Sequence, residues 1–176
     1  MIDVLCLGEP LLEFNEQQPG QYVRSIGGDV SNVAVAVARQ GGQAGMLTRM
    51  GLDSFAAEIL QLWERERIDT SRIIRDEEAP TGIYFISHGP NGHVFDYRRA
   101  GSASSCLRSS DLKKEHFEGV QILHLSGISL ALSDSACEAS LRAIELAKEN
   151  GVKISFDTNL RLKLWSLSRA KAIIQH

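Results

Sequence analysis

The feature that most constrains the fold is a run of mainly apolar residues at the start of the chain, Ile2–Leu7, which ends at Gly8. Such a run is typical of a strand buried on both faces, as strands are in parallel sheets covered by helices. Similar runs recur along the chain, and we expect strands at residues 44–49, 120–125 and 152–156. The sequence therefore predicts an α/β protein.

Helical patterns alternate with these strands. Residues 31–40 are rich in Ala and Val and end at two glycines, which is a typical helix stop. Residues 53–67 begin at a capping Asp and carry apolar side chains at helical spacing. Residues 133–149 form a third helical pattern, and a last helix is expected to start near Ser168. The order is that of βαβα units.

The middle of the chain differs. Residues 82–87 and 93–98 are β-type runs separated by a loop with Gly, Pro and Asn, which predicts a hairpin, and residues 21–24 form a further short strand. We expect these strands to form a small sheet at one edge of the α/β core. The expected division is an α/β core of residues 1–9, 26–79 and 101–176, with a β lid of residues 10–25 and 80–100. The core is expected to be incomplete at its C-terminus, because no strand follows the last helix.

Composition, net charge and cysteine spacing argue against several classes of function. The 176 residues are 43% hydrophobic and 23% charged, an ordinary globular composition. A net charge of -3 argues against a nucleic-acid partner, which needs a basic field. No run approaches the roughly 20 apolar residues of a membrane span, and the N-terminus has no signal-peptide pattern. The three cysteines lack CxxC spacing, so we expect reduced thiols, with Cys6 in the core, in a cytoplasmic protein.

The first candidate site is residues 26–32, where paired glycines open a helix after a strand. Glycines allow a ligand to approach the backbone closely, and a helix N-terminus offers free N–H groups with partial positive charge. Asn32 could bond a hydroxyl through its amide. The alternative is a tight turn in which Asp29 or Ser31 is an ordinary helix cap. The segment matches neither the Walker pattern nor GxGxxG.

The second candidate site is the expected hairpin. Tyr97 and Arg99 are two residues apart, so on a strand they share a face, with Tyr84 as a cross-strand neighbour and Arg98 pointing away. Two phenols and a guanidinium on one face could recognise a carboxylate and hydroxyls of a small polar ligand. The alternative is a solvated hairpin, where Tyr and Arg are common.

The third candidate site follows the strand at 152–156, where Asp157, Asn159 and Arg161 alternate in a polar loop. Open α/β sheets bind ligands at such strand ends. Arg161 could stabilise a phosphate or bind an anionic substrate. Alternatively, Asp157 caps a turn and Arg161 forms a surface ion pair, while Trp165 packs the loop. The five histidines, residues 88, 93, 116, 124 and 176, have no ligand spacing, so no metal site is expected.

These segments together resemble the ribokinase-like (PfkB) carbohydrate kinases, and most closely the 2-keto-3-deoxygluconate kinases. The matching motifs occur in the family's order along essentially the whole chain. They are Gly8-Glu9-Pro10, residues 27–32, residues 97–103, His124-Leu125-Ser126-Gly127, residues 157–161 and Leu164-Trp165. The resemblance implies a Rossmann-type three-layer core with a β lid over the sugar. It also implies phosphoryl transfer from ATP, with Mg²⁺, to a hydroxyl of a sugar acid.

The resemblance also implies roles for particular residues. The sugar acid would be held by Gly28, Asp29, Val30, Ser31, Asn32, Tyr84, Tyr97 and Arg99. Arg161 would contact both the substrate and the transferred phosphate, and Asn159 would lie near the nucleotide. Glu13 falls where ribokinases carry an Asp that contacts the sugar.

One departure from the family matters. Its second signature, a DTxGAGD-type loop that supplies an anion hole and the catalytic base, is absent from the sequence. We therefore expect an N-terminal portion of a longer kinase, inactive alone, with an open sheet edge beside residues 152–156. Alternatives are a fructokinase or another neutral-sugar kinase, and a non-catalytic sugar-binding or assembly protein. A homodimer through the lid is a further expectation.

Overall fold

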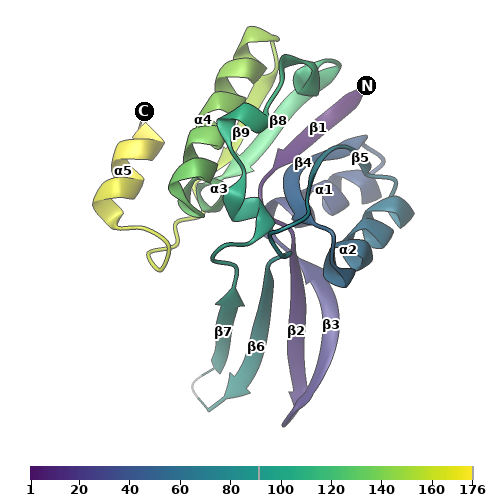
Figure 1. Ribbon diagram of the computed structural model, residues 1–176, viewed down its shortest axis with the longest axis vertical. Coiled ribbons are helices and arrows are strands. Elements are labelled where there is room, and N and C mark those ends of the chain that lie inside the picture. The colour runs from purple at the N-terminus through teal and green to yellow at the C-terminus, as the bar shows by residue number, and fades with distance from the viewer. Residues whose placement is uncertain (91, 176) are drawn as a thin grey trace.

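The computed structural model describes residues 1–90 and 92–175 of the chain. Asn91 of the expected hairpin loop and His176, one of the five histidines considered above, lie outside these residues. The chain forms two sheets, with helices gathered around the larger one and the smaller one projecting from its end (Figure 1).

The larger sheet has five parallel strands in the order β5-β4-β1-β8-β9. They span β1 Ile2–Leu7, β4 Ala44–Gly51, β5 Asp69–Asp76, β8 Val120–Ser126 and β9 Lys153–Asp157. The first strand lies at the centre, and its residues Leu5, Cys6 and Leu7 are almost completely buried. The apolar run at the start of the chain is thus the middle of the core, as its composition predicted.

Helices cover both faces of this sheet and make three layers. On one face, α1 (Asp29–Arg39) and α2 (Ser54–Arg65) pack with Cys6 and Met46. On the other face, α4 (Asp134–Glu149) packs with Leu5 and Leu123. A short helix, α3 (Gly127–Ala131), follows β8, and α5 (Leu167–Gln175) lies beyond β9. Short 3₁₀ turns at Ala103–Cys106, Ser109–Asp111 and Lys114–Phe117 connect β7 to β8.

The smaller sheet, called the lid below, has the strand order β3-β2-β6-β7. Its strands are β2 Leu11–Gln18, β3 Gln21–Gly27, β6 Ile83–Gly89 and β7 Gly92–Arg98. Two antiparallel hairpins, β2–β3 and β6–β7, are joined by the parallel pairing of β2 with β6. The chain crosses between core and lid at residues 8–10, 27–28, 77–82 and 99–102. These four segments are called the crossings.

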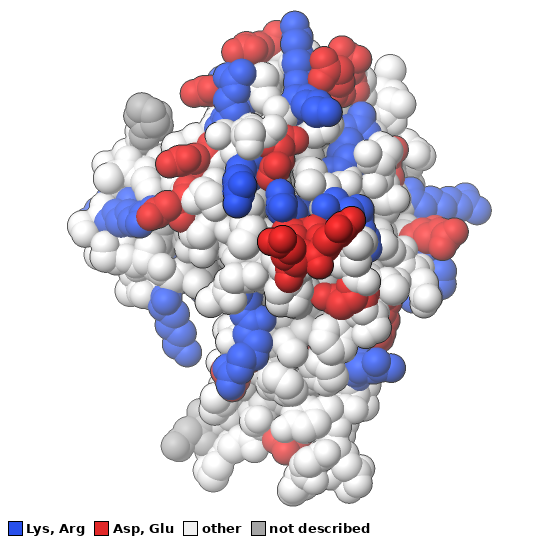
Figure 2. All heavy atoms as spheres, in the orientation of Figure 1, with Lys and Arg blue, Asp and Glu red and all other residues white. Residues whose placement is uncertain are grey.

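On the face shown in Figure 2, acidic and basic side chains intermix over the core, whereas the lid is mostly uncharged. Within the described part of the chain, no helix is long and apolar enough to cross a membrane.

Several details differ from the sequence prediction, among them the cap of α1 and the strand β5. The cap of α1 is Gly28, with φ 104°, and no side chain caps the helix, so neither Asp29 nor Ser31 is the cap. A Cβ at this position would lie 2.5 Å from the carbonyl oxygen of Glu9, so both the backbone angle and the space require glycine. The strand β5 was not predicted. It is an edge strand, and only Ile73 and Ile74 of its residues are apolar.

Candidate functional site

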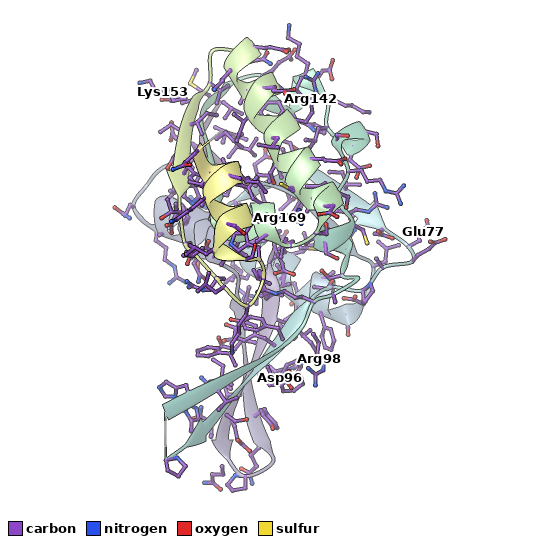
Figure 3. All side chains as sticks on the ribbon, turned by 90° about the vertical axis from the view of Figure 1, so that its left-hand side faces the viewer. Glu77, Asp96, Arg98, Arg142, Lys153 and Arg169 are labelled. Atoms are coloured by element: carbon purple, nitrogen blue, oxygen red, sulfur yellow. The ribbon has the colours of Figure 1, made fainter. Side chains whose placement is uncertain are left out.

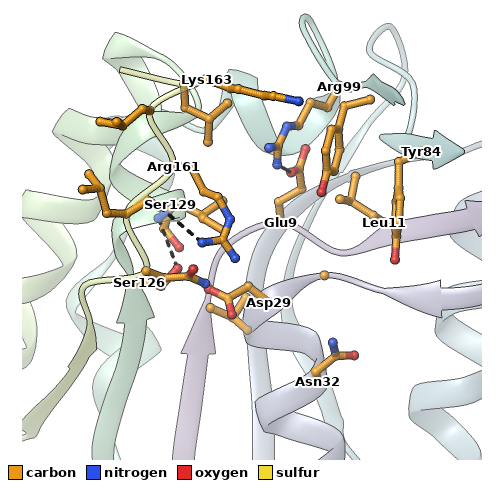
Figure 4. A pocket seen from close by; sticks show the side chains of 18 of the residues that line it. Glu9, Leu11, Asp29, Asn32, Tyr84, Arg99, Ser126, Ser129, Arg161 and Lys163 are labelled. Carbon is orange, nitrogen blue, oxygen red and sulfur yellow. Dashed lines mark hydrogen bonds and ion pairs between the residues drawn. The ribbon is translucent and has the colours of Figure 1, made fainter. Parts of the chain in front are cut away.

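A cavity of about 620 Å³ lies between the lid and the ends of the core strands. It is bounded by the N-terminus of α1, the lid strands β6 and β7, and the loop from β9 to α5 (Figure 4). This is the carboxyl edge of a parallel sheet, where open α/β proteins bind ligands. The predicted site residues that line it are Gly28, Asp29, Val30, Asn32, Tyr84, Tyr97, Arg99, Asn159 and Arg161.

Ser31 is the predicted site residue that does not line the cavity. Its side chain is buried, and its hydroxyl oxygen accepts a hydrogen bond from Nε1 of Trp63 at 3.1 Å. On a helix, adjacent residues face different directions, so Asn32 reaches the cavity while Ser31 faces α2. The hydroxyl of Ser31 therefore faces the core, and the expected role of Ser31 in holding the ligand stays a prediction.

The floor of the cavity is the first turn of α1. Free N–H groups and partial positive charge gather at this end of the helix. One carboxylate oxygen of Asp29, Oδ2, is buried and has no hydrogen-bond partner among the described residues. Asn32, one turn further along, is exposed and lines the cavity. The floor therefore offers acceptor and donor groups suited to hydroxyls.

The lid wall is an aromatic stack. Tyr84 and Tyr97 are directly opposed across β6 and β7, and their rings lie 5.3 Å apart and nearly parallel. Tyr84 donates its hydroxyl proton to the carboxylate of Glu13, which also accepts a hydrogen bond of 2.9 Å from Ser25. Burial and this carboxylate raise the pKa of Tyr84. The Tyr84 oxygen is therefore left to accept, not donate, a hydrogen bond from a ligand.

Arg99 lies just past the end of β7, in the crossing back to the core. Its Cζ is 4.3 Å from the centre of the Tyr97 ring, so the guanidinium extends the aromatic wall. Its Nη1 donates to Oε2 of Glu9 at 2.8 Å. Arg98 turns away, as predicted, and pairs with exposed Asp96 on the outside of the lid (Figure 3).

Glu9 is a residue of this site that the sequence analysis named only as part of the Gly8-Glu9-Pro10 motif, without a role. Its carboxylate is 2% exposed and lies against Arg99, which is 12% exposed. Burial raises the pKa of the Glu9 carboxyl, and the charge of Arg99 and the hydrogen bond that it donates act in the opposite direction. The signal in the sequence was an acidic residue directly after the central buried strand, at the edge where ligands bind.

The third wall is the loop from β9 to α5. Asp157 accepts a hydrogen bond of 3.0 Å from the backbone N–H of Asn159, so it caps a turn, as the alternative reading proposed. Arg161 contacts the carbonyl oxygen of Leu160 at 3.3 Å, and no ion pair within residues 1–90 and 92–175 includes Arg161 or Lys163. Trp165 is buried and packs the loop, as expected. Arg161 and Lys163 therefore both line the cavity, and neither has an acidic partner in the part of the chain that the structure describes (Figure 4).

A metal site would need several His, Cys, Asp or Glu side chains close together. The described residues contain no group of three or more His, Cys, Asp or Glu side chains that could hold a metal ion. The loop from β9 to α5 carries Arg161 and Lys163, and side chains of this kind bind phosphate oxygens well.

Comparison with known proteins identifies related chains. The chain is 34% identical over 174 residues to 2-dehydro-3-deoxygluconokinase of Thermoproteus tenax, covering 94% of the chain and 52% of the relative. It is 32% identical over 171 residues to a probable fructokinase-3 of Arabidopsis thaliana, covering 92% of the chain and 49% of that protein. The chain thus spans about half the length of the curated relatives that it matches.

Solved structures agree with this relationship. The crystal structure of a PfkB protein from Polaromonas sp. JS666 superposes with a TM-score of 0.93 at 28% identity, covering 99% of the chain and 62% of that protein. A fructokinase from Xylella fastidiosa with bound ATP gives a TM-score of 0.89 at 26% identity, covering 98% and 55%. The family model described as pfkB family carbohydrate kinase matches residues 1–176. With its lid, its cavity and this match over its whole length, the chain belongs to the pfkB family of carbohydrate kinases.

Proposed function

We propose that the chain forms the sugar-binding part of an ATP-dependent kinase that acts on a sugar acid. The proposed substrate is 2-keto-3-deoxygluconate, and the product is its 6-phosphate. One observation carries this proposal: a single cavity is lined by Tyr84 and Tyr97 of the lid, by Arg99 at the end of the lid and by Arg161 of the core. Phenol hydroxyls suit sugar hydroxyls, and guanidinium groups suit a carboxylate. The 34% identical relative, a 2-dehydro-3-deoxygluconokinase, supports the same substrate class.

In this proposal the residues divide the work of binding. Gly28, Asp29 and Asn32 take sugar hydroxyls at the N-terminus of α1, and Val30 closes the floor behind them. Tyr84 and Tyr97 cover the sugar from the lid and exclude water, while Arg99 and Arg161 bind the carboxylate. Phosphoryl transfer depends mainly on such positioning and on stabilisation of charge.

ATP would approach the loop from β9 to α5. Arg161 has no acidic partner among the described residues and so fits the charge of a phosphate, and Asn159 lies beside it. The fructokinase solved with bound ATP supports ATP as the phosphate source. Mg²⁺ would neutralise the phosphates when bound, and we assign it no protein ligand in this chain.

We further propose that the 176 residues bind sugar but do not transfer phosphate by themselves. The family loop with the anion hole and base is not in the sequence, and one of the two carboxylates lining the cavity, Glu9, is paired with Arg99. A coupled ATP-consumption assay should give no turnover above background. Turnover that is abolished by Arg161→Ala would contradict this part of the proposal.

A neutral-sugar kinase such as a fructokinase is the second candidate. It is favoured by one specific observation, the ion pair between Glu9 and Arg99. A guanidinium that is already paired with a carboxylate attracts the carboxylate of a substrate less than an unpaired guanidinium does. The probable fructokinase-3 relative agrees with it. A non-catalytic sugar-binding or assembly protein remains the alternative from another class, and it shares the binding step.

Calorimetric titration separates these candidates. Wild-type chain should bind 2-keto-3-deoxygluconate more tightly than fructose, and Arg161→Ala should weaken the acid about tenfold or more, since a charge-assisted bond contributes about 1.5–3 kcal/mol. Arg98→Ala is the matched control, because Arg98 lies on the outer face of the lid. Tighter binding of fructose would favour the second candidate, and binding of neither sugar would overturn the proposal.

A further inference from the structure

One buried carboxylate, that of Glu9, lies where segments that connect the lid to the core come together. Glu9 lies in the crossing from β1 to β2, and its side chain accepts hydrogen bonds from Nη1 of Arg99 at 2.8 Å and from the hydroxyl of Ser102 at 3.4 Å. Both donors belong to the crossing from β7 back to the core. The two crossings are 90 residues apart in the chain and are joined by this group.

The other two crossings also pack against Glu9. A Cβ built on Gly82, in the crossing from β5 to β6, would lie 3.1 Å from Oε1 of Glu9. A Cβ built on Gly28, in the crossing from β3 to α1, would lie 2.5 Å from the Glu9 carbonyl oxygen. Glycine at both positions leaves room for Glu9, so every segment that connects lid to core touches this residue.

Glu9 also acts on the cavity, which it lines together with Arg99. The guanidinium is held from below by the carboxylate and from the side by the Tyr97 ring. Of the nitrogen atoms of Arg99, Nη1 is the one that bonds Glu9, and its other N–H groups have no hydrogen-bond partner among residues 1–90 and 92–175. Because the ion pair is largely buried, water screens it little, and the negative charge of Glu9 acts strongly on a ligand at the cavity wall.

We propose that Glu9 is a positioning residue that fixes Arg99 across the junction of lid and core and, by offsetting its charge, sets the preference of the cavity between anionic and neutral sugars. This inference rests on the proposed sugar-binding function and adds a determinant of specificity to it. Arg161 and Lys163 supply attraction for an anion, whereas Glu9 moderates that of Arg99.

The substitution Glu9→Gln tests the charge while keeping an oxygen that can accept from Arg99. The affinity for 2-keto-3-deoxygluconate relative to fructose, measured by calorimetry, should rise about tenfold, because a like charge is removed from beside the substrate carboxylate. Glu9→Ala removes charge and anchor together, so both sugars should weaken. Equal changes for the two sugars in Glu9→Gln would overturn the inference.

The matched control is Glu58→Gln. Glu58 of α2 pairs with Arg24 of β3 at 3.2 Å, so it too is an ion pair between core and lid, but it is more exposed and does not line the cavity. It should leave the ratio of the two affinities unchanged. If it shifts the ratio as much as Glu9→Gln does, the effect comes from tethering the lid and the inference fails.

A second comparison covers the case in which Glu9→Gln alone does not fold. Arg99→Ala leaves the Glu9 carboxylate unpaired at the wall, and the acid should weaken at least tenfold more than fructose. Adding Glu9→Gln to Arg99→Ala should restore much of that excess loss, and no restoration would overturn the inference. Wild-type chain that binds neither sugar would overturn the proposed function and this inference with it. An unchanged ratio in a chain that binds sugar overturns the inference alone.

Discussion

At the scale of single residues, the position of Tyr84 depends on the absence of a side chain at Gly27. A Cβ on Gly27 would lie 2.6 Å from the Tyr84 hydroxyl oxygen. We expect Gly27→Ala to displace the ring from the aromatic wall, to weaken sugar binding about tenfold and to cost about 1–3 kcal/mol of stability, as overpacking does. Calorimetry and urea unfolding measure both effects.

Gly89→Ala is the control, because Gly89 lies in β6, the strand of Tyr84, and a Cβ there would be 3.9 Å from its nearest neighbour. It should leave sugar affinity nearly unchanged. Equal losses of affinity in the two variants would show that the Tyr84 hydroxyl needs no such space.

The hydrogen bonds of Asp76 make the stability of the fold depend on pH in the acid range. Its carboxylate accepts hydrogen bonds from the backbone N–H groups of Glu78 and Ala79, and from Nε of Arg49 at 2.6 Å. The Ala79 amide first, and then Arg49, lower its pKa from 3.8 to about 2. A lowered folded-state pKa stabilises the fold above the unfolded value, so the benefit is complete above about pH 4 and is lost as the pH falls toward 2.

We therefore expect Asp76→Asn to destabilise the protein by about 1–2 kcal/mol at pH 7, with allowance for solvent screening, and by much less at pH 2.5. Urea unfolding at pH 7, 4 and 2.5 provides the measurement. A loss that stays constant over this range would mean that hydrogen-bond geometry, and not charge, is responsible.

At the scale of elements, the first turn of α2 joins a helix to the lid. Asp53 caps the helix by accepting from the N–H of Ala56 at 2.8 Å, and its other oxygen accepts from the N–H of Thr81 at 2.7 Å, in the crossing to β6. We expect Asp53→Ala to cost about 2 kcal/mol, at the upper end for a helix cap, because two backbone donors lose their acceptor. Asp53→Ser should cost less, since it retains a cap, and equal losses in thermal unfolding would refute the cap's contribution.

The elements also show what the sequence can predict. Buried strands such as β1 and amphipathic helices such as α2 were expected nearly in full, because their patterns are local and their burial is continuous. The strand β5 was not, since an edge strand needs little apolar content to pair. Its hydrogen bonds to β4 hold it in the sheet.

In the candidate site too, features set by local sequence patterns were predictable and features set by distant contacts were not. Motifs at strand ends and in the hairpin located the cavity, because topology alone brings those ends together. The orientation of Ser31 toward Trp63 and the partnership of Arg99 with Glu9 depend on contacts 32 and 90 residues apart. No local pattern contains such contacts, so the roles of these side chains required the structure.

At the scale of the whole molecule, the lid is the surface best suited to a second copy of the chain. The edge strand β7 is exposed throughout, with Val94 62% and Phe95 43% exposed, and Val23 of the opposite edge strand is also exposed. Exposed apolar edges tend to pair. We propose a homodimer formed through the lid, in which burial of these side chains supplies the association energy.

Sedimentation equilibrium tests this dimer against a contact through β9, one of the two edge strands of the core sheet. Phe95→Glu should shift the chain toward the monomer mass, because a charge would then be buried in the contact. Ile154→Lys is the comparison: Ile154 is partly buried on β9, beside an apolar hollow of about 410 Å³. It should leave the mass of a lid dimer unchanged. Dissociation by Ile154→Lys and not by Phe95→Glu would place the contact on β9, and a wild-type chain that is monomeric at all concentrations would exclude both surfaces.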